Sequence, residues 1–356
     1  MAWLDRDDPS VRYVAASLIA GVFFGGLAGG VAFPTLPQLG VLLGISPLLV
    51  GVILSINRFT RLLMSTPAGQ ILDRIGTRRP MIVGFFVQAL APFGYALALH
   101  APEFNVPSSS VFLISRALWG IGSAFVFVGA FSTITHITTQ ENRGKWIGYM
   151  RGGQSLGFPT GLVAGGLITD VYGFEIAFLT AGVAGMFSAL VAFAVLPDIS
   201  PDVGATSRLR EIPSIIQADP RVFTIGTVNF IVRFLFAGVL LSTVVLFAGA
   251  NNINIGTMSE TGVSGIVMAI SVVFASVTTV FVGRKSDSLS NRAYVTIPAL
   301  GLLAAGFAVL SVFPTLPGTL LGVGMIGVGV GGTNPPLVAF LGDISPSSDV
   351  GKMGGV

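Results

Sequence analysis

The stretch GQILDRIGTRRP, residues 69–80, places Asp73, Arg74, Arg78 and Arg79 within seven positions of a chain that is only 10% charged. Long apolar stretches flank it, and 52% of the 356 residues are hydrophobic. Soluble proteins carry about 25% charged residues, so this chain lacks the charge to cover a surface in water. Apolar runs of about 20 residues can cross a bilayer as helices. The composition therefore predicts an all-α polytopic membrane protein.

Outward from residues 69–80, hydropathy predicts about ten membrane spans. These are 13–36, 47–67, 80–99, 111–135, 146–169, 174–196, 221–249, 258–282, 293–313 and 318–341. The longest polar interruption, residues 197–220, is rich in Pro, Asp and Ser and is typical of a linker. We therefore expect an N-terminal half of six helices (1–196), a cytoplasmic linker (197–220) and a C-terminal half (221–356).

The basic residues predict the orientation of the chain. Of 19 Lys and Arg, all but the four inside spans lie at the N-terminus, at residue 352, or in the alternate connections 69–80, 143–151, 208–221 and 284–292. Lys and Arg mark the cytoplasmic side of a membrane protein. We expect a multi-pass protein of the plasma membrane with a cytoplasmic N-terminus, and residues 69–80 on the cytoplasmic side.

The two halves repeat each other at nearly constant offsets. Gly69 to Asp73 returns as Gly283 to Asp287, 214 positions later, and RGKWIG at 143–148 returns as VGKMGG at 350–355, 207 positions later. Parallel repeats of this kind are typical of transporters whose pathway lies between the halves. The offset makes VGKMGG the start of a further span, so we expect two C-terminal helices of the second half to be missing.

Residues 69–80 resemble the signature of the major facilitator superfamily, G-x-x-x-D-R-x-G-x-[RK]-[RK], between its second and third spans. Gly69, Asp73, Arg74, Gly76, Arg78 and Arg79 match it. The resemblance implies two pseudo-symmetric six-helix bundles. It also implies that this signature and its fainter copy, with Gly283, Asp287 and Arg292, hold the cytoplasmic ends of the helices together during the transport cycle. The alternative is that the arginines only set the topology.

Two further elements resemble motifs of proton-coupled family members. RALWGIG contains Arg116, Gly120 and Gly122 in the pattern R-x-x-x-G-x-G of the fourth span. GFPTG contains Gly157, Pro159 and Gly161 and matches, imperfectly, the glycine–proline motif of drug/proton antiporters. We expect these small residues to allow close helix packing. Arg116 either faces a cavity or extends its side chain to the membrane surface.

Polar residues inside the spans are candidates for substrate or proton binding. They are Asn57, Arg58, Arg61, Arg116, Asn229 and Arg233. Buried arginines are costly in a membrane and by default mark function, although hydrogen bonds to carbonyls are a structural alternative. Gln38, Gln88 and Gln154 could add hydrogen bonds.

No Asp or Glu lies near the middle of a span, which favours anionic or neutral substrates over cations. We expect a secondary active transporter working by alternating access, most simply proton-coupled efflux of hydrophobic or amphipathic small molecules. Import or exchange of organic anions is the alternative, and a transport-inactive receptor or scaffold is a third. No phosphate-binding loop, metal-ligand spacing or catalytic set is present, so we expect neither an enzyme nor a cofactor. The expected partners are a small-molecule substrate, protons and lipids, without nucleic acid, and the expected state is a monomer.

Overall fold

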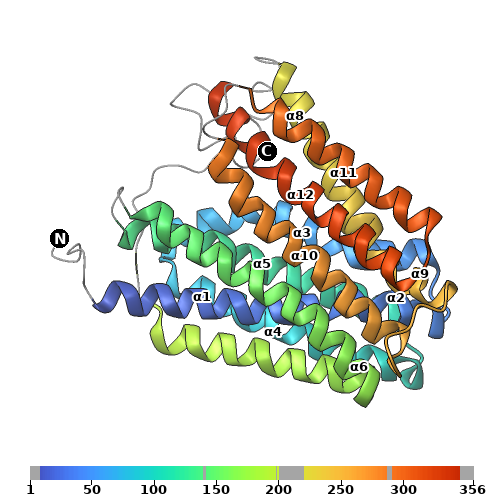
Figure 1. Ribbon diagram of the computed structural model, residues 1–356. Coiled ribbons are helices and arrows are strands. Elements are labelled where there is room, and N and C mark those ends of the chain that lie inside the picture. The colour runs from blue at the N-terminus through green and yellow to red at the C-terminus, as the bar shows by residue number, and fades with distance from the viewer. Residues whose placement is uncertain (1–8, 139–141, 198, 200–219, 287–290, 345–356) are drawn as a thin grey trace. The chain divides into compact units, whose positions relative to one another are not determined.

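The computed structural model describes residues 9–138, 142–197, 199, 220–286 and 291–344 (Figure 1), and the regular secondary structure of that part is helical, without β-strands. It divides into two compact units, Met1–Thr206 and Ser207–Val356, here called the N-terminal and C-terminal units.

The helices of each unit follow one another with short connections. The N-terminal unit contains α1 (Pro9–Gly30), α2 (Ala32–Leu42), α3 (Pro47–Ile75), α4 (Arg78–His100), the 3₁₀ turn η1 (Ala101–Phe104), α5 (Ser108–Ile137) and α6 (Arg143–Val195). The C-terminal unit contains α8 (Pro220–Arg233), the π-helical η3 (Phe234–Leu240), α9 (Leu241–Ala250), α10 (Glu260–Ser286), α11 (Ala293–Val312) and α12 (Leu316–Ile344).

Within the described residues, nine helical segments are long and apolar enough to cross a membrane. One of them, Lys145–Val195, is 51 residues long, which is far more than the roughly 20 residues that one crossing needs. Its backbone leaves the helical region at Gly173, with φ 86° and ψ 171°, a conformation open to glycine because it has no Cβ. Counted as two legs, α6 supplies both the fifth and the sixth predicted spans.

The helix contacts agree with alternating crossing directions in the N-terminal unit. Close approaches pair Gly157 with Phe23 and Gly161 with Leu27, so the first leg of α6 runs parallel to α1. The second leg runs antiparallel to α4, because Gly182 approaches Phe93 whereas the later Gly185 approaches Ala89. Consecutive spans must cross a membrane in opposite directions. Spans one and five should therefore run parallel, and spans three and six antiparallel, as these contacts show.

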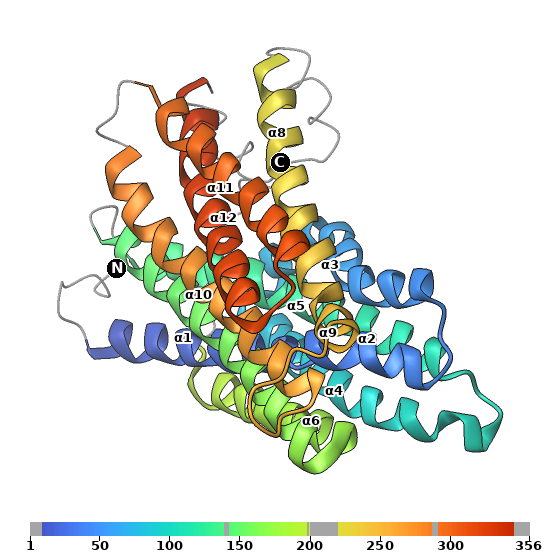
Figure 2. The ribbon, with the colours of Figure 1, turned by 45° about the vertical axis from the view of Figure 1, so that its right-hand side comes forward.

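The C-terminal unit repeats these contacts. A Cβ placed on Gly120 of α5 would lie 2.4 Å from the carbonyl oxygen of Asn57 of α3, and one on Gly327 of α12 would lie 2.3 Å from that of Ser271 of α10. Ser271 follows Asn57 by 214 positions and Gly327 follows Gly120 by 207, the two offsets found in the sequence. Figure 2 shows α12 beside both α10 and α11, the pairings that α5 makes with α3 and α4. The pseudo-symmetry of the halves therefore holds at single contacts.

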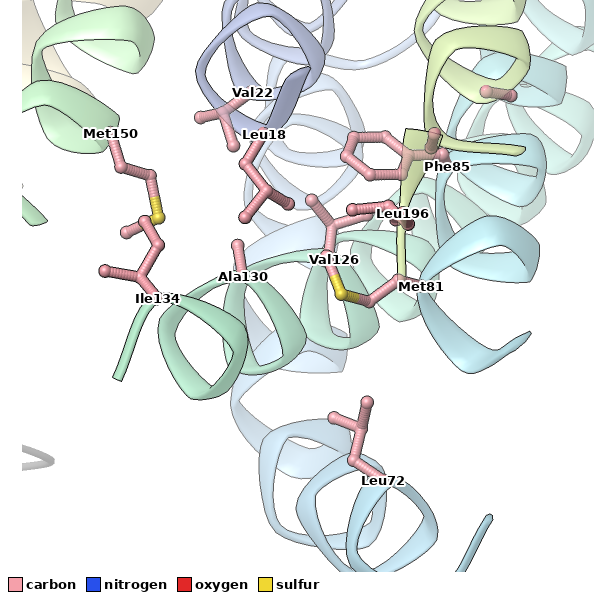
Figure 3. Packing of buried hydrophobic residues seen from close by; sticks show 12 residues of the cluster. Leu18, Val22, Leu72, Met81, Phe85, Val126, Ala130, Ile134, Met150 and Leu196 are labelled. Carbon is pink, nitrogen blue, oxygen red and sulfur yellow. The ribbon is translucent and has the colours of Figure 1, made fainter. Parts of the chain in front are cut away.

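The core of the N-terminal unit lies toward the end where α3 meets α4 and α6 ends. Figure 3 shows Leu18 and Val22 of α1 facing Phe85 of α4 and Val126 of α5, all at most 3% exposed. Side chains from five helices, α1 and α3 to α6, converge there. This packing holds the end of α3 and the start of α4, which carry the charged residues 73–79, close to the end of α6.

Candidate functional site

Arg116 is wholly buried inside the N-terminal unit, with 0% exposure. Its Nε donates to the carbonyl oxygen of Ile53 at 3.4 Å, and its Nη2 donates to the carbonyl oxygen of Leu54 at 3.1 Å and to Asn57 Oδ1 at 3.5 Å. The guanidinium of α5 is therefore bound to one stretch of α3. The alternative that Arg116 reaches the membrane surface is wrong, because these acceptors lie on the neighbouring helix and are reached without leaving the bundle.

The three intramembrane arginines of this unit each lie over one of two phenylalanine rings. The Cζ atoms of Arg116 and Arg58 lie 5.6 and 5.9 Å from the centroid of the Phe33 ring, and Arg61 Cζ lies 5.3 Å from that of Phe127. Guanidinium groups at such distances are attracted by the negative face of the ring. We call these five residues the arginine–phenylalanine cluster; it gathers three positive charges in one region of a membrane bundle.

The cluster depends on close contact between α3 and α5. At Gly120 a Cβ would lie 1.8 Å from Thr60 Oγ1, and at Gly122 it would lie 2.5 Å from the carbonyl oxygen of Gly84 on α4. Both distances are far below van der Waals contact, so neither position accepts a larger residue without a shift of the helices. The R-x-x-x-G-x-G pattern thus places Arg116 one turn from the contact that brings its acceptors within reach.

The glycines of α6 form a row along α1. Cβ atoms on Gly157 and Gly161 would lie 2.1 and 2.0 Å from the carbonyl oxygens of Phe23 and Leu27, and Gly153 and Gly165 extend the row by one turn each way. The four-residue spacing keeps them on one helical face. Pro159 is buried within the same stretch.

In the C-terminal unit, Arg233 lies between two asparagines. Its Nε donates to Asn229 Oδ1 at 3.0 Å, one turn earlier on α8, and its Nη2 donates to Asn334 Oδ1 of α12 at 3.4 Å. Sequence reasoning paired Asn229 with Arg233 by spacing but missed Asn334. The π-helical η3 begins directly after Arg233, and such irregular turns are frequent at functional sites.

The signature residues do not form an extended turn between the spans. Helix α3 continues to Ile75 and α4 begins at Arg78, so Gly69, Asp73 and Arg74 are helical and only two residues separate the helices. Gly76, with φ 83°, ends α3 by donating its N–H to the Leu72 carbonyl oxygen at 3.0 Å. Helix α3 therefore continues past the predicted end of the second span at residue 67, because Pro67 is accommodated within the helix.

The beginning of α4 holds the end of α6. Arg78 Nη2 donates to the carbonyl oxygen of Phe193 at 3.2 Å, and Thr77 N–H donates to that of Ile199 at 2.9 Å. The last carbonyls of a helix lack helical partners and carry partial negative charge, so a cation stabilises them. Arg79 is exposed in the same turn.

Asp73 occupies an unfavourable place, because a carboxylate in the last turn of α3 meets the negative end of the helix dipole. It forms no hydrogen bond or ion pair with another described residue. In the fainter copy of the signature, Gly283 lies in α10 near Pro335 of α12, and Arg292 directly precedes α11. Asp287 lies outside the described residues.

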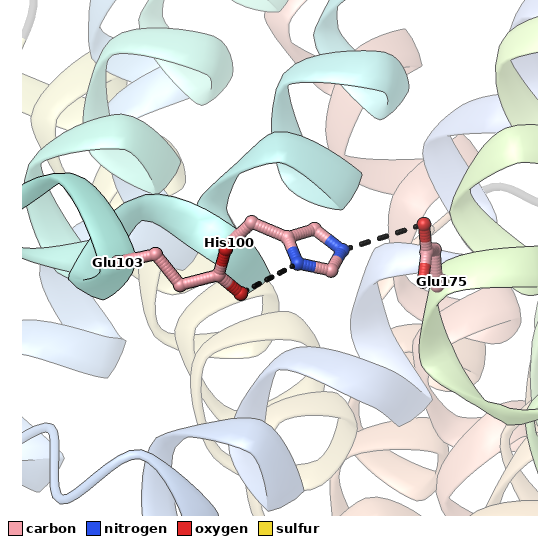
Figure 4. A network of polar contacts seen from close by, with 3 residues as sticks. All are labelled: His100, Glu103 and Glu175. Carbon is pink, nitrogen blue, oxygen red and sulfur yellow. Dashed lines mark hydrogen bonds and ion pairs between the residues drawn. The ribbon is translucent and has the colours of Figure 1, made fainter.

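One polar network was not predicted from the sequence. His100, the last residue of α4, lies with Nδ1 3.1 Å from Glu103 Oε1 and Nε2 3.4 Å from Glu175 Oε1 (Figure 4). It joins α4 to the second leg of α6 at the end opposite to Arg78. Because each ring nitrogen faces a carboxylate, only the doubly protonated imidazolium can donate to both. In the described part of the chain, no group of three or more acidic, His or Cys side chains could hold a metal ion.

Comparison with known proteins identifies the family. The family model described as Major Facilitator Superfamily matches residues 18–356. The chain belongs to this superfamily. It is a multi-pass membrane transporter that acts on small molecules, and not an enzyme. Among solved structures, a bacterial homolog of the human lysosomal transporter Spinster superimposes with a TM-score of 0.78 at 16% identity, covering 98% of this chain and 77% of that one. A D-xylose–proton symporter gives 0.77 at 15%, covering 97% and 85%.

Curated relatives of the superfamily transporter include multidrug resistance proteins. Multidrug resistance protein 2 of Bacillus subtilis is 23% identical over 304 residues, 84% of this chain and 74% of the relative. Multidrug resistance protein 1 of the same organism is 27% identical over 187 residues, 52% and 46% of the two chains. The quinolone resistance protein NorA of Staphylococcus aureus is 23% identical over 195 residues, 55% and 47%. For the second and third of these, the chain spans only about half of the relative's length.

Proposed function

We propose that this superfamily member exports hydrophobic or amphipathic small molecules by alternating access, driven by protons moving into the cell. The similarity to multidrug resistance proteins over 84% of this chain carries the proposal. The R-x-x-x-G-x-G and glycine–proline elements support it, because they resemble motifs of proton-coupled members. We further propose action as a monomer in the plasma membrane, surrounded by lipid, with a cytoplasmic N-terminus, as the Lys and Arg distribution indicates.

In this proposal Arg78 and Asp73, which lie at the same end of the N-terminal unit, have different tasks. Arg78 closes the α4–α6 end within the unit, whereas Asp73 has no described partner within it. We assign Asp73 to a contact that forms in only one state of the transport cycle, the gating role implied by the superfamily signature. Its substitution by Asn should slow cycling without loss of folded protein.

The arginine–phenylalanine cluster supports a second candidate function, uptake or exchange of organic anions. Guanidinium forks bind carboxylate and phosphate groups well, and two of the three arginines, Arg58 and Arg61, are less buried than Arg116. The same cluster also suits neutral amphipathic compounds, because they can stack on the phenylalanine rings without forming an ion pair with the arginines.

Transport in vesicles separates these candidates. The purified protein would be reconstituted into liposomes loaded with a lipophilic fluorescent dye, with a pH gradient imposed or collapsed by nigericin. Proton-driven efflux predicts dye loss only with the gradient, and Asp73→Asn should slow it at equal protein content. Dye loss that ignores the gradient would overturn the coupling. Uptake of a labelled aromatic carboxylate, abolished by Arg61→Ala, would favour anion transport, and failure of both transport assays would favour a receptor or scaffold.

A further inference from the structure

His100 and two carboxylates join α4 to the second leg of α6 close to its bend. His100 ends α4 and Glu103 follows in η1, whereas Glu175 lies two residues after the bend at Gly173. The Nδ1 atom of the ring lies 3.1 Å from Glu103 Oε1, and Nε2 lies 3.4 Å from Glu175 Oε1 (Figure 4). We call these three residues the histidine–glutamate cluster. It bridges the end of one helix and the start of another through a single imidazole ring.

The bend of α6 is itself loosely packed. Tyr172 and Ile176 beside it are exposed, and no atom lies within 4 Å of the position of a Cβ on Gly173. Tight packing of the second leg begins near the fully buried Phe178, whose ring centroid lies 5.4 Å from that of Tyr95 on α4. The first turn after the bend therefore depends on the histidine–glutamate cluster more than the later turns of the leg do.

Only one protonation state of His100 makes both contacts. The imidazolium donates from both ring nitrogens, whereas the neutral ring has one N–H and presents a lone pair to the other carboxylate. No other cation serves this end of the unit: residues 14–57 and 105–115, on the elements packed beside α4, contain no ionisable side chain, and the nearby titratable groups of α6 are Asp170 and Tyr172. Carboxylates on both sides of the ring favour its charged form.

We infer that the histidine–glutamate cluster is a proton-dependent bridge, which holds the first turn after the bend of α6 on α4 while His100 carries a proton and releases this turn when the proton leaves. The bridge stabilises the folded turn at acidic pH, and the stabilisation is lost as the pH rises through the titration of His100. The three side chains are 47–68% exposed, so protons reach them without entering the bundle. In the orientation proposed above they face the outside of the cell, but the bridge requires neither that orientation nor transport.

Nuclear magnetic resonance can follow the proton on His100 directly. The chain has two histidines, so ¹³C-histidine labelling of the full chain in micelles gives two titrations, and His136→Gln assigns the remaining one to His100. Glu103→Gln and Glu175→Gln each remove one carboxylate, and each should move the titration of His100 to lower pH. His136 is the matched control, because its Nδ1 contacts the Ser132 carbonyl oxygen of its own helix at 2.9 Å. A titration of His100 that either substitution leaves in place overturns the inference.

Hydrogen exchange, corrected for the intrinsic rate at each pH, tests the conformational part. The amides of residues 177–180 bond to the carbonyls of the first turn after the bend. They should lose protection as the pH rises through the titration of His100, whereas the amides of 182–189, where the leg packs closely on α4, should not. In His100→Gln, whose side chain does not titrate, protection of 177–180 should not follow the pH. Protection that is constant in the wild type, or that changes equally in His100→Gln, overturns the inference. A failure of dye transport would not affect this result.

Discussion

Replacing Gly161 by alanine tests the packing of α6 on α1 quantitatively. The new Cβ would lie 2.0 Å from the Leu27 carbonyl oxygen, whereas ordinary contact begins near 3.4 Å. The opposing atom is backbone and cannot rotate away, so the helices must separate by more than about 1 Å. A gap of 0.5–1 Å already forfeits about a quarter to a half of each van der Waals contact, and overpacking of a tight core costs about 1–3 kcal/mol.

The matched control lies on the same helix. At Gly152 no atom lies within 4 Å of the position of a Cβ. Alanine there should gain up to about 1 kcal/mol from helix propensity. That same gain partly offsets the clash at Gly161, for which we expect a net loss of up to about 2 kcal/mol. Because this gain is common to both variants, they should differ by the cost of the clash, about 1–3 kcal/mol in the free energy of unfolding.

Thermal unfolding in micelles, followed by size-exclusion chromatography after heating, measures this difference. At about 2–4 °C per kcal/mol for a domain of 150–250 residues, Gly161→Ala should melt roughly 2–12 °C below Gly152→Ala. Equal melting temperatures for the two variants would refute the reasoning, because the helix-propensity change is the same and only the contact with α1 differs.

Three further experiments test the charged contacts. Arg116→Lys keeps the charge but loses the planar fork, so we expect at least a tenfold fall in transport with the protein still monodisperse; unchanged transport would show that the fork is dispensable. Arg78→Ala should speed hydrogen exchange at the end of α6, whereas Arg79→Ala should not, and equal exchange in both would contradict the carbonyl contact. A double-mutant cycle of His100→Ala and Glu175→Gln should show stronger coupling at pH 5 than at pH 9, since neutral imidazole donates only one hydrogen bond; equal coupling at both pH values would argue against the bridge.

The spans and the repeat could be predicted because both depend on patterns along the chain. Hydropathy gives the positions of apolar segments, and the offsets of 207 and 214 reappear as the contacts of Gly120 and Gly327. Helix ends were predicted less well. The charged residues 69–75 continue α3 beyond its apolar part, because charge ends a membrane span but does not end a helix.

Partners across the bundle could not be predicted, since nothing along the chain sets the rotation of one helix against another. Arg116 was identified, but its acceptors on α3 and the shared Phe33 ring depend on the packing of α2, α3 and α5. His100 and Glu175 are 75 positions apart and meet only because α6 reverses at Gly173. By contrast, the four-residue spacing from Gly153 to Gly165 is visible in the sequence and could have predicted the full glycine row.

Alternation between two arrangements of the units is the central claim, and one distance measurement tests it most directly. The chain contains no cysteine, so Ile75→Cys and Asn291→Cys, one exposed position in each unit, accept spin labels without background. Double electron–electron resonance in liposomes should show two distance populations whose ratio changes with acidification and with added dye. A single distance that ignores both pH and dye would contradict alternating access.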